Sequence, residues 1–155
     1  MAGAARPFWV RVHRWAGLAT ALFLCVAGLT GSILAFKEEL DAWLNPQWFL
    51  APGDGRVMLD PFALREAVRQ QLPWAVVDQV PLRREADRAV VFRLSPQRDA
   101  ASGRALPLAA THAFADPYSG KVLGWRNEGV ASLARENLLP FIYRLHLDLT
   151  LPGIW

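Results

Sequence analysis

The chain has 155 residues, of which 53% are hydrophobic, and its formal net charge is only +3. This length leaves room for one membrane span and one modest folded domain. The arginines are scattered rather than gathered into a basic run, which argues against nucleic-acid binding. The single cysteine, Cys25, excludes a disulfide or a cysteine-based metal site within one chain.

Residues 15–36 form an apolar run that carries no formal charge. A helix of this length rises about 33 Å, which is enough to cross a bilayer core of about 30 Å. The sequence therefore predicts a transmembrane helix over residues 15–36. A cleaved signal peptide is the alternative, but the run is longer than a typical signal core, and Ala35-Phe36-Lys37 is a poor cleavage site.

Charges on the two sides of the span predict its orientation. Residues 1–14 carry three arginines and no acid, whereas residues 37–45 carry one lysine and three acids. The positive-inside rule then places residues 1–14 in the cytoplasm and residue 37 onward outside. Aromatic residues flank the run as predicted belts at the two interfaces: Phe8, Trp9 and Trp15 on one side, and Phe36, Trp43, Trp48 and Phe49 on the other.

Small residues gather on one face of the predicted span. In a helix, one face would hold His13, Gly17, Ala21, Leu24, Gly28, Gly31 and Ala35. Small residues let another helix or a flat cofactor come close, so we expect this face to pack, with His13 at its cytoplasmic end. The alternative is that glycine is simply common in membrane helices and that His13 is an interfacial polar residue.

The segment after the span predicts a small α+β domain. Residues 37–55 are interpreted as a helix end followed by a Pro- and Gly-rich linker. Asp60 and Pro61 are typical of a helix start, and Pro73 ends the helix that follows. Strands are predicted at residues 74–83, with an edge position at Pro81, and at residues 88–94, 108–115 and 121–126, the last two joined by a turn. In the strand at 88–94, alternation places Val90, Phe92 and Leu94 on one face.

Residues 129–155 are predicted to lead toward a second membrane helix. Val130 to Leu138 has a helical pattern, and Pro140 is expected to interrupt it. Apolar residues then continue at helical spacing at Phe141, Ile142, Leu145 and Leu149. We interpret the sequence as the N-terminal part of a longer protein, and the alternative is a shorter form that keeps only the anchor and the outer domain.

Several stretches resemble one protein family, the PepSY-associated transmembrane family. Arg11-Val-His-Arg-Trp-Ala-Gly-Leu18, Gly28-Leu-Thr-Gly31 and residues 36–46 resemble its first membrane helix. Residues 56–128 are similar to a PepSY domain, including the hairpin at 116–122, and Leu145-His146-Leu147 is similar to the start of the family's second membrane helix. The family includes iron-regulated membrane proteins and ferric-siderophore reductases of the inner membrane of Gram-negative bacteria.

The resemblance implies transfer of electrons across the inner membrane, through b-type haem, to ferric iron in periplasmic siderophores. His13 and His146 would be axial ligands on different haems, because they would lie at opposite ends of a membrane crossing. The glycines Gly17, Gly28 and Gly31 would form the packing face beside them. The implied partners are the lipid bilayer, further transmembrane helices of the same protein or of a homo-oligomer, and a ferric siderophore.

The resemblance leaves these 155 residues without catalytic activity of their own, because each histidine needs a partner imidazole from another helix. A second function class is a non-enzymatic, membrane-anchored PepSY module that binds or regulates a periplasmic protein or peptidase through an exposed sheet edge. His112 is expected on a strand, at the surface or half-buried. The acids Glu38, Glu39 and Asp41 are expected to form a solvated helix end rather than an iron-attracting rim.

Overall fold

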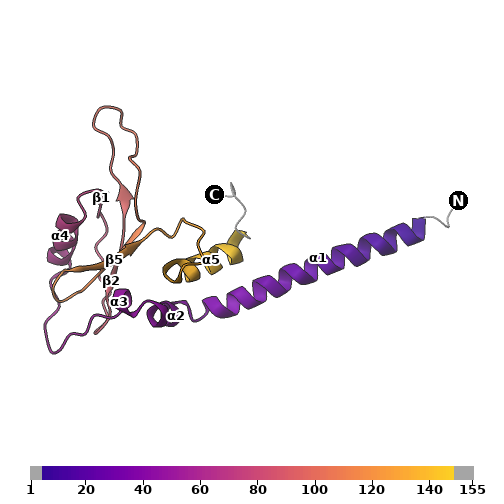
Figure 1. The fold of residues 1–155 in the computed structure, drawn as a ribbon, viewed down its shortest axis with the longest axis horizontal. Helices are drawn as coiled ribbons and strands as arrows, with labels where there is room; N and C mark the ends of the chain where they lie inside the picture. Colours follow the sequence, from indigo (N-terminus) through magenta and orange to yellow (C-terminus); the bar gives the residue numbers. More distant parts are fainter. Residues whose placement is uncertain (1–4, 149–155) are drawn as a thin grey trace. The chain divides into compact units, whose positions relative to one another are not determined.

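The computed structural model describes residues 5–148, and this part of the chain falls into two compact units. One unit contains residues 5–37 and 142–148, and the other contains residues 38–141. The fold class is α+β, as predicted: a long apolar helix precedes small antiparallel sheets and a C-terminal helix (Figure 1).

Helix α1, Ala5–Leu34, is the long apolar helix, and it begins before the predicted start at Trp15. Pro7 does not interrupt the helix, because it lies in the first turn, where the backbone N–H has no partner within the helix. The helix therefore also includes the arginines that precede the apolar run. Among the described residues, Arg6–Leu34 is the one helix that is long and apolar enough to cross a membrane. Its bulky side chains, such as Leu22 and Leu29, are exposed.

The main sheet has three antiparallel strands in the order β2-β4-β5, and it lies in the unit of residues 38–141. Their bounds are Val90–Arg93 for β2, His112–Ala115 for β4 and Val122–Arg126 for β5. In the register, Val91 lies opposite Phe114, and Phe114 lies opposite Gly124.

The predicted turn between β4 and β5 is confirmed. The Asp116 carboxylate accepts hydrogen bonds from Tyr118 N at 2.8 Å and from Ser119 Oγ at 2.6 Å. Gly120 closes the turn at a φ of +74°, a conformation that side chains disfavour, and a Cβ there would also collide with Ala67. The turn is thus specified by local chemistry.

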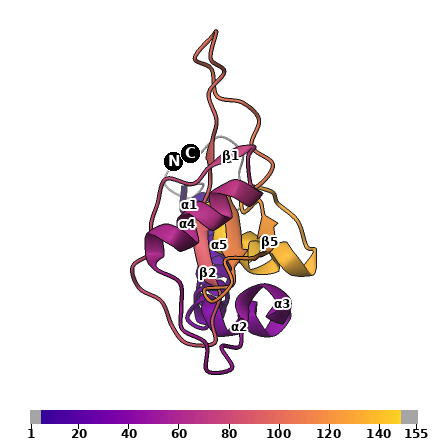
Figure 2. The same ribbon diagram turned by 90° about the vertical axis from the view of Figure 1, so that its left-hand side faces the viewer.

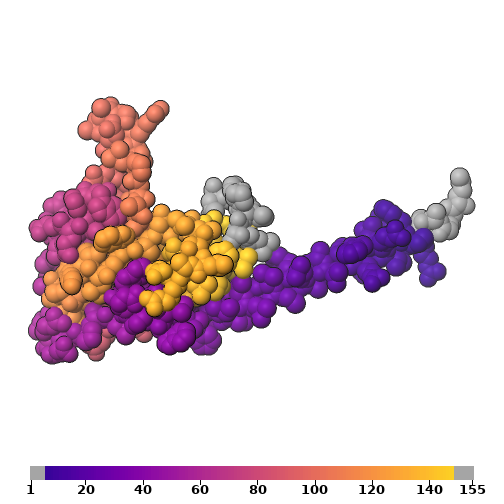
Figure 3. All heavy atoms as spheres, viewed as in Figure 1, coloured from indigo at the N-terminus to yellow at the C-terminus, as the bar shows by residue number. Residues whose placement is uncertain are grey.

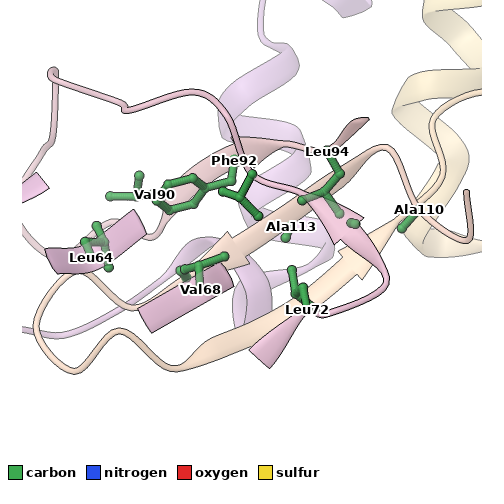
Figure 4. Close-up of a cluster of buried hydrophobic side chains, with 11 residues drawn as sticks. Leu64, Val68, Leu72, Val90, Phe92, Leu94, Ala110 and Ala113 are labelled. Carbon is green, nitrogen blue, oxygen red and sulfur yellow. The ribbon is translucent and has the colours of Figure 1, made fainter. Parts of the chain in front are cut away.

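Helix α4, Pro61–Gln71, covers one face of the main sheet (Figure 2). It begins where predicted, because the Asp60 side chain accepts hydrogen bonds from Phe62 N at 2.9 Å and Ala63 N at 3.4 Å. Its buried side chains meet those of the strands in one hydrophobic core (Figure 4), which includes Leu64, Val68, Leu72, Val90, Phe92, Leu94, Ala113 and Ala115. The predicted burial of alternate residues along β2 is confirmed.

The opposite face of the sheet packs against aromatic residues of α3, Pro46–Phe49, which follows α2, Lys37–Leu44. Trp48 stacks on Phe114 with ring centroids 5.6 Å apart, and it fills the space that a Cβ of Gly124 would need. Phe49 also lies against Phe114, with ring centroids 4.7 Å apart. The prediction that residues 46–49 are linker is therefore wrong, because they form a helix and the sheet offers the rings of Trp48 and Phe49 a packing surface.

The predicted strand at 74–83 is mostly wrong. Only β1, Ala75–Val76, forms there, and it pairs with β3, Ser95–Pro96, in a separate two-stranded sheet. Pro81 lies outside the strands, since it lacks the N–H that a ladder needs. Beyond β3, residues 97–106 form a hairpin, with a bridge between Arg98 and Ala105, that stands out from the unit (Figure 3).

The predicted helix at Val130 to Leu138 is also wrong. A short 3-10 helix, η1, covers Arg135–Asn137, and α5 covers Leu138–Asp148. Pro140 does not interrupt α5, because it stands in the first turn, where the N–H groups have no partner within the helix. The predicted continuation to Leu149 lies outside the described residues.

We expect Phe92→Ala to lower the free energy of unfolding by about 3–5 kcal/mol, because Phe92 is 0% exposed and its removal leaves a cavity. The matched control is Val91→Ala, on the adjacent residue that is 42% exposed, with an expected loss of about 1 kcal/mol or less. Denaturant titration followed by tryptophan fluorescence measures both. Equal losses for the two variants would contradict this assignment of the core.

A second prediction concerns the turn at Asp116. Burial raises the pKa of its carboxyl, but hydrogen bonds from Ser119 and Tyr118 outweigh burial and hold the pKa below its usual value. A depressed pKa stabilises the fold above the unfolded value of about 3.9 and loses that contribution as the pH falls through the folded value. The destabilisation by Asp116→Asn should therefore be larger at about pH 6 than at about pH 3.

Denaturant titration at the two pH values tests this, and Ser119→Ala, which removes one donor, should reduce the pH dependence without abolishing it. A difference between wild type and Asp116→Asn that is the same at both pH values would refute the role of the ionised carboxylate.

Candidate functional site

His146 lies on α5 and contacts the C-terminal part of α1 within the same unit. Its Nδ1 atom lies 3.0 Å from Thr30 Oγ1, and Thr30 is 6% exposed. Gly31 borders the ring, since a Cβ at Gly31 would stand 3.1 Å from His146 Cε1. The face of small residues therefore meets a second helix at Gly31, next to Thr30. The side chain that contacts it there, His146, is one of the two predicted ligands.

The other predicted ligand, His13, lies on the N-terminal half of α1 and is exposed. At a rise of about 1.5 Å per residue, His13 lies about 26 Å from Thr30 along the helix, and therefore far from His146. A shared iron would hold both ring nitrogens within a few ångströms of each other, so the two histidines belong to separate sites. No neighbour lies within 4 Å of a Cβ placed at Gly17 or Gly28, so both keep open space beside α1 in the described structure.

A third feature of the structure is a buried arginine on the second face of the main sheet. Arg126, the last residue of β5, places Nη2 2.7 Å from Asp41 Oδ2 and 2.7 Å from Glu128 Oε1. Its Nη1 donates to Asp41 Oδ1 at 2.9 Å and to the backbone oxygen of Glu136 at 3.0 Å. Asp41 also accepts a hydrogen bond from Asn45 Nδ2. The guanidinium thus links α2, the end of β5 and η1.

The surroundings keep Arg126 charged. The guanidinium carbon lies 5.6 Å from the ring centre of Phe49 and 5.3 Å from that of Phe114, within cation–π range. Burial lowers the pKa of Arg126, but hydrogen bonds and charge from Asp41 and Glu128 outweigh it, so the pKa lies above its ordinary value. Because its donors are engaged by the protein, we assign the cluster a structural role.

Asp41 corrects one prediction from the sequence. Glu38 and Glu39 are exposed, as a solvated helix end requires, but Asp41 is 2% exposed and paired with Arg126. The partners lie far apart in the chain, so spacing carries no direct sign of the pair. Two features of the sequence could have indicated the pair. Alternation along β5 places Arg126 on the face opposite the exposed one, and Asp41 lies on the apolar side of a short helix.

His112 is half-buried at the start of β4, as predicted. Its Nδ1 lies 3.0 Å from Thr111 Oγ1 and 3.6 Å from Glu128 Oε2, so it adjoins the Arg126 cluster. Thr111 Oγ1 also accepts a hydrogen bond from Glu128 N. Among the residues 5–148, no group of three or more His, Cys, Asp and Glu side chains is arranged to hold a metal ion.

Comparison with known protein families gives a match to almost the whole chain. The family described as the PepSY-associated TM region matches residues 10–155. No curated protein sequence matches. The matched range includes His13, His146, the face of small residues and the whole unit of residues 38–141.

We expect Arg126→Met to lower the free energy of unfolding by about 3–5 kcal/mol, because it leaves Asp41 buried without a counter-charge. The double variant Asp41→Leu with Arg126→Met should recover much of this loss. Arg83→Met, which breaks the exposed pair with Glu85, serves as the control and should cost less than about 1 kcal/mol. Denaturant titration measures all three, and an Arg126→Met variant as stable as the control would disprove the buried pair.

Proposed function

The chain belongs to the PepSY-associated transmembrane family, and from this premise we propose that it carries electrons across the bacterial inner membrane to ferric iron in periplasmic siderophores. Family membership and the apolar helix α1 together establish a membrane-associated PepSY protein. The observation that carries the finer proposal is that two histidines meet the candidate span α1 at positions about 26 Å apart along it, His13 on the helix itself and His146 against Thr30. Such spacing suits two redox sites, one toward each surface of a bilayer.

His13 and His146 are the residues that would hold b-type haem. A neutral imidazole is a common axial ligand, and the donor set therefore fits the group. Each histidine would hold its haem together with a residue of another helix, either outside the residues described or in a second copy of the chain. Haem, when bound, would supply the one-electron carrier, and Gly17 would leave open space beside His13.

The remaining residues would insulate and orient the path. The bulky side chains of α1, such as Leu22 and Leu29, are suited to face lipid and exclude water. Arg6, Arg11 and Arg14 favour a cytoplasmic N-terminus, which would place residues 38–141 in the periplasm. A one-electron reductant on the cytoplasmic side would then meet the protein near His13, and the ferric substrate would meet it near His146.

The protein purified from membranes of cells that express the complete gene tests this proposal. Its reduced-minus-oxidised spectrum should show b-type haem with two histidine ligands. His13→Ala and His146→Ala should each lose part of the haem, because each removes one ligand of a different iron. His112→Ala, the matched histidine in the sheet unit, should lose none. Wild-type protein without haem, or full haem content in both ligand variants, would refute the proposal.

A second candidate function is a membrane-anchored PepSY module that binds a periplasmic protein, and one observation favours it. Strand β5 is an outer strand of the main sheet, and Trp125 on it is 51% exposed beside Trp74. An open edge with an exposed aromatic ring is suited to pair with an extended peptide. The edge proposed for binding is therefore β5, whereas Pro81, where the sequence predicted an edge position, lies outside the strands. Haem-free wild-type protein that retains a periplasmic partner through affinity purification would select this candidate.

A further inference from the structure

We propose that Thr30 is a positioning residue that keeps His146 in the tautomer with a protonated Nδ1 and a free lone pair on Nε2. The inference rests on the proposed function, because it concerns how His146 is prepared as a ligand. It starts from the hydrogen bonds of Thr30, whose hydroxyl lies between the backbone of α1 and the imidazole of α5.

The hydroxyl proton of Thr30 is directed into its own helix. Thr30 Oγ1 lies 2.7 Å from the carbonyl oxygen of Val26 and 3.2 Å from that of Ala27. A carbonyl oxygen only accepts hydrogen bonds, and a hydroxyl has a single proton to donate. A threonine in a helix commonly bonds the preceding turn in this way. The shorter contact assigns the proton to Val26.

The tautomer of His146 follows from this assignment. Toward the imidazole, Thr30 Oγ1 is left with lone pairs only, so it must accept the hydrogen bond across the 3.0 Å to Nδ1. Nδ1 therefore carries the proton. A neutral imidazole has one N–H, which leaves Nε2 as the unprotonated nitrogen that can bind a metal.

Two contacts fix the ring as well as its proton. Gly31 allows the imidazole to lie close to α1, because a Cβ there would stand only 3.1 Å from Cε1. Thr30 is 6% exposed, so the hydrogen bond is sheltered from solvent. Histidines that bind metals are commonly held this way: the ring nitrogen that does not bind the metal donates its N–H to a fixed acceptor, which orients the ring and raises its basicity as a ligand. In this chain the acceptor is a hydroxyl whose own donation to Val26 strengthens it.

The first test measures the tautomer of His146 in protein without haem. In the full protein labelled with ¹⁵N-histidine and prepared free of haem, the shifts of His146 should report a protonated Nδ1. Thr30→Val, which keeps the shape and removes the acceptor, should shift the population toward a protonated Nε2. Thr30→Ser should keep the wild-type pattern. A wild-type His146 with a protonated Nε2 overturns the inference.

The second test measures the properties of the protein with haem bound. Thr30→Val should weaken haem retention at the His146 site by about tenfold or more, the usual loss when such a support is removed. It should also raise the reduction potential of that site and alter its ferric electron paramagnetic resonance spectrum. Ser32→Ala is the matched control, because Ser32 Oγ donates to Gly28 O on the same helix at 2.8 Å and is exposed. Ser32→Ala should leave haem retention, the reduction potential and the spectrum unchanged.

The two proposals fail in different ways. Wild-type protein without haem overturns the proposed function, and the ¹⁵N measurement then decides the tautomer by itself. In another outcome, His146→Ala loses haem, but Thr30→Val keeps the haem affinity, reduction potential and spectrum of the wild type. This result would leave the proposed function in place and overturn the role of Thr30.

Discussion

A guanidinium buried beneath a sheet must have its donors engaged, because an unpaired charge in a low-dielectric interior costs several kcal/mol. Arg126 meets this requirement with Asp41 on α2, Glu128 just after β5 and the carbonyl of Glu136 in η1. One side chain therefore determines where three stretches of chain lie on the second face of the sheet. On the first face, α4 contributes apolar side chains to the hydrophobic core, and its Gln71 hydrogen-bonds the backbone of Gly120 and Val122.

Features set by neighbouring residues were predictable from the sequence. The cap at Asp60, the alternation along β2 and the turn at Asp116 each depend on a few consecutive residues, and the structure confirms them. The missed features depend on distant partners or on position within an element. Asp41 is buried because Arg126 lies opposite it, and α5 accommodates Pro140 because that proline falls in the first turn.

The same distinction applies to the candidate site. The family resemblance singled out His146, the helical pattern singled out the small residue Gly31, and the structure brings the two together. Thr30 escaped prediction because a threonine in an apolar helix is ordinary, and its meeting with His146 depends on how α5 packs. At Gly31 the space is taken by the imidazole itself, whereas the glycines nearer His13 keep their space open.

The way Thr30 uses its proton also bears on biosynthesis. Helix α1 is synthesised before α5, and a polar group without a partner in an apolar environment is costly. The carbonyl of Val26, on the same helix, lies 2.7 Å from the Thr30 hydroxyl, so this hydroxyl has a hydrogen-bond partner before His146 is made. The contact with His146 is then added to a side chain that already has a partner within its own helix.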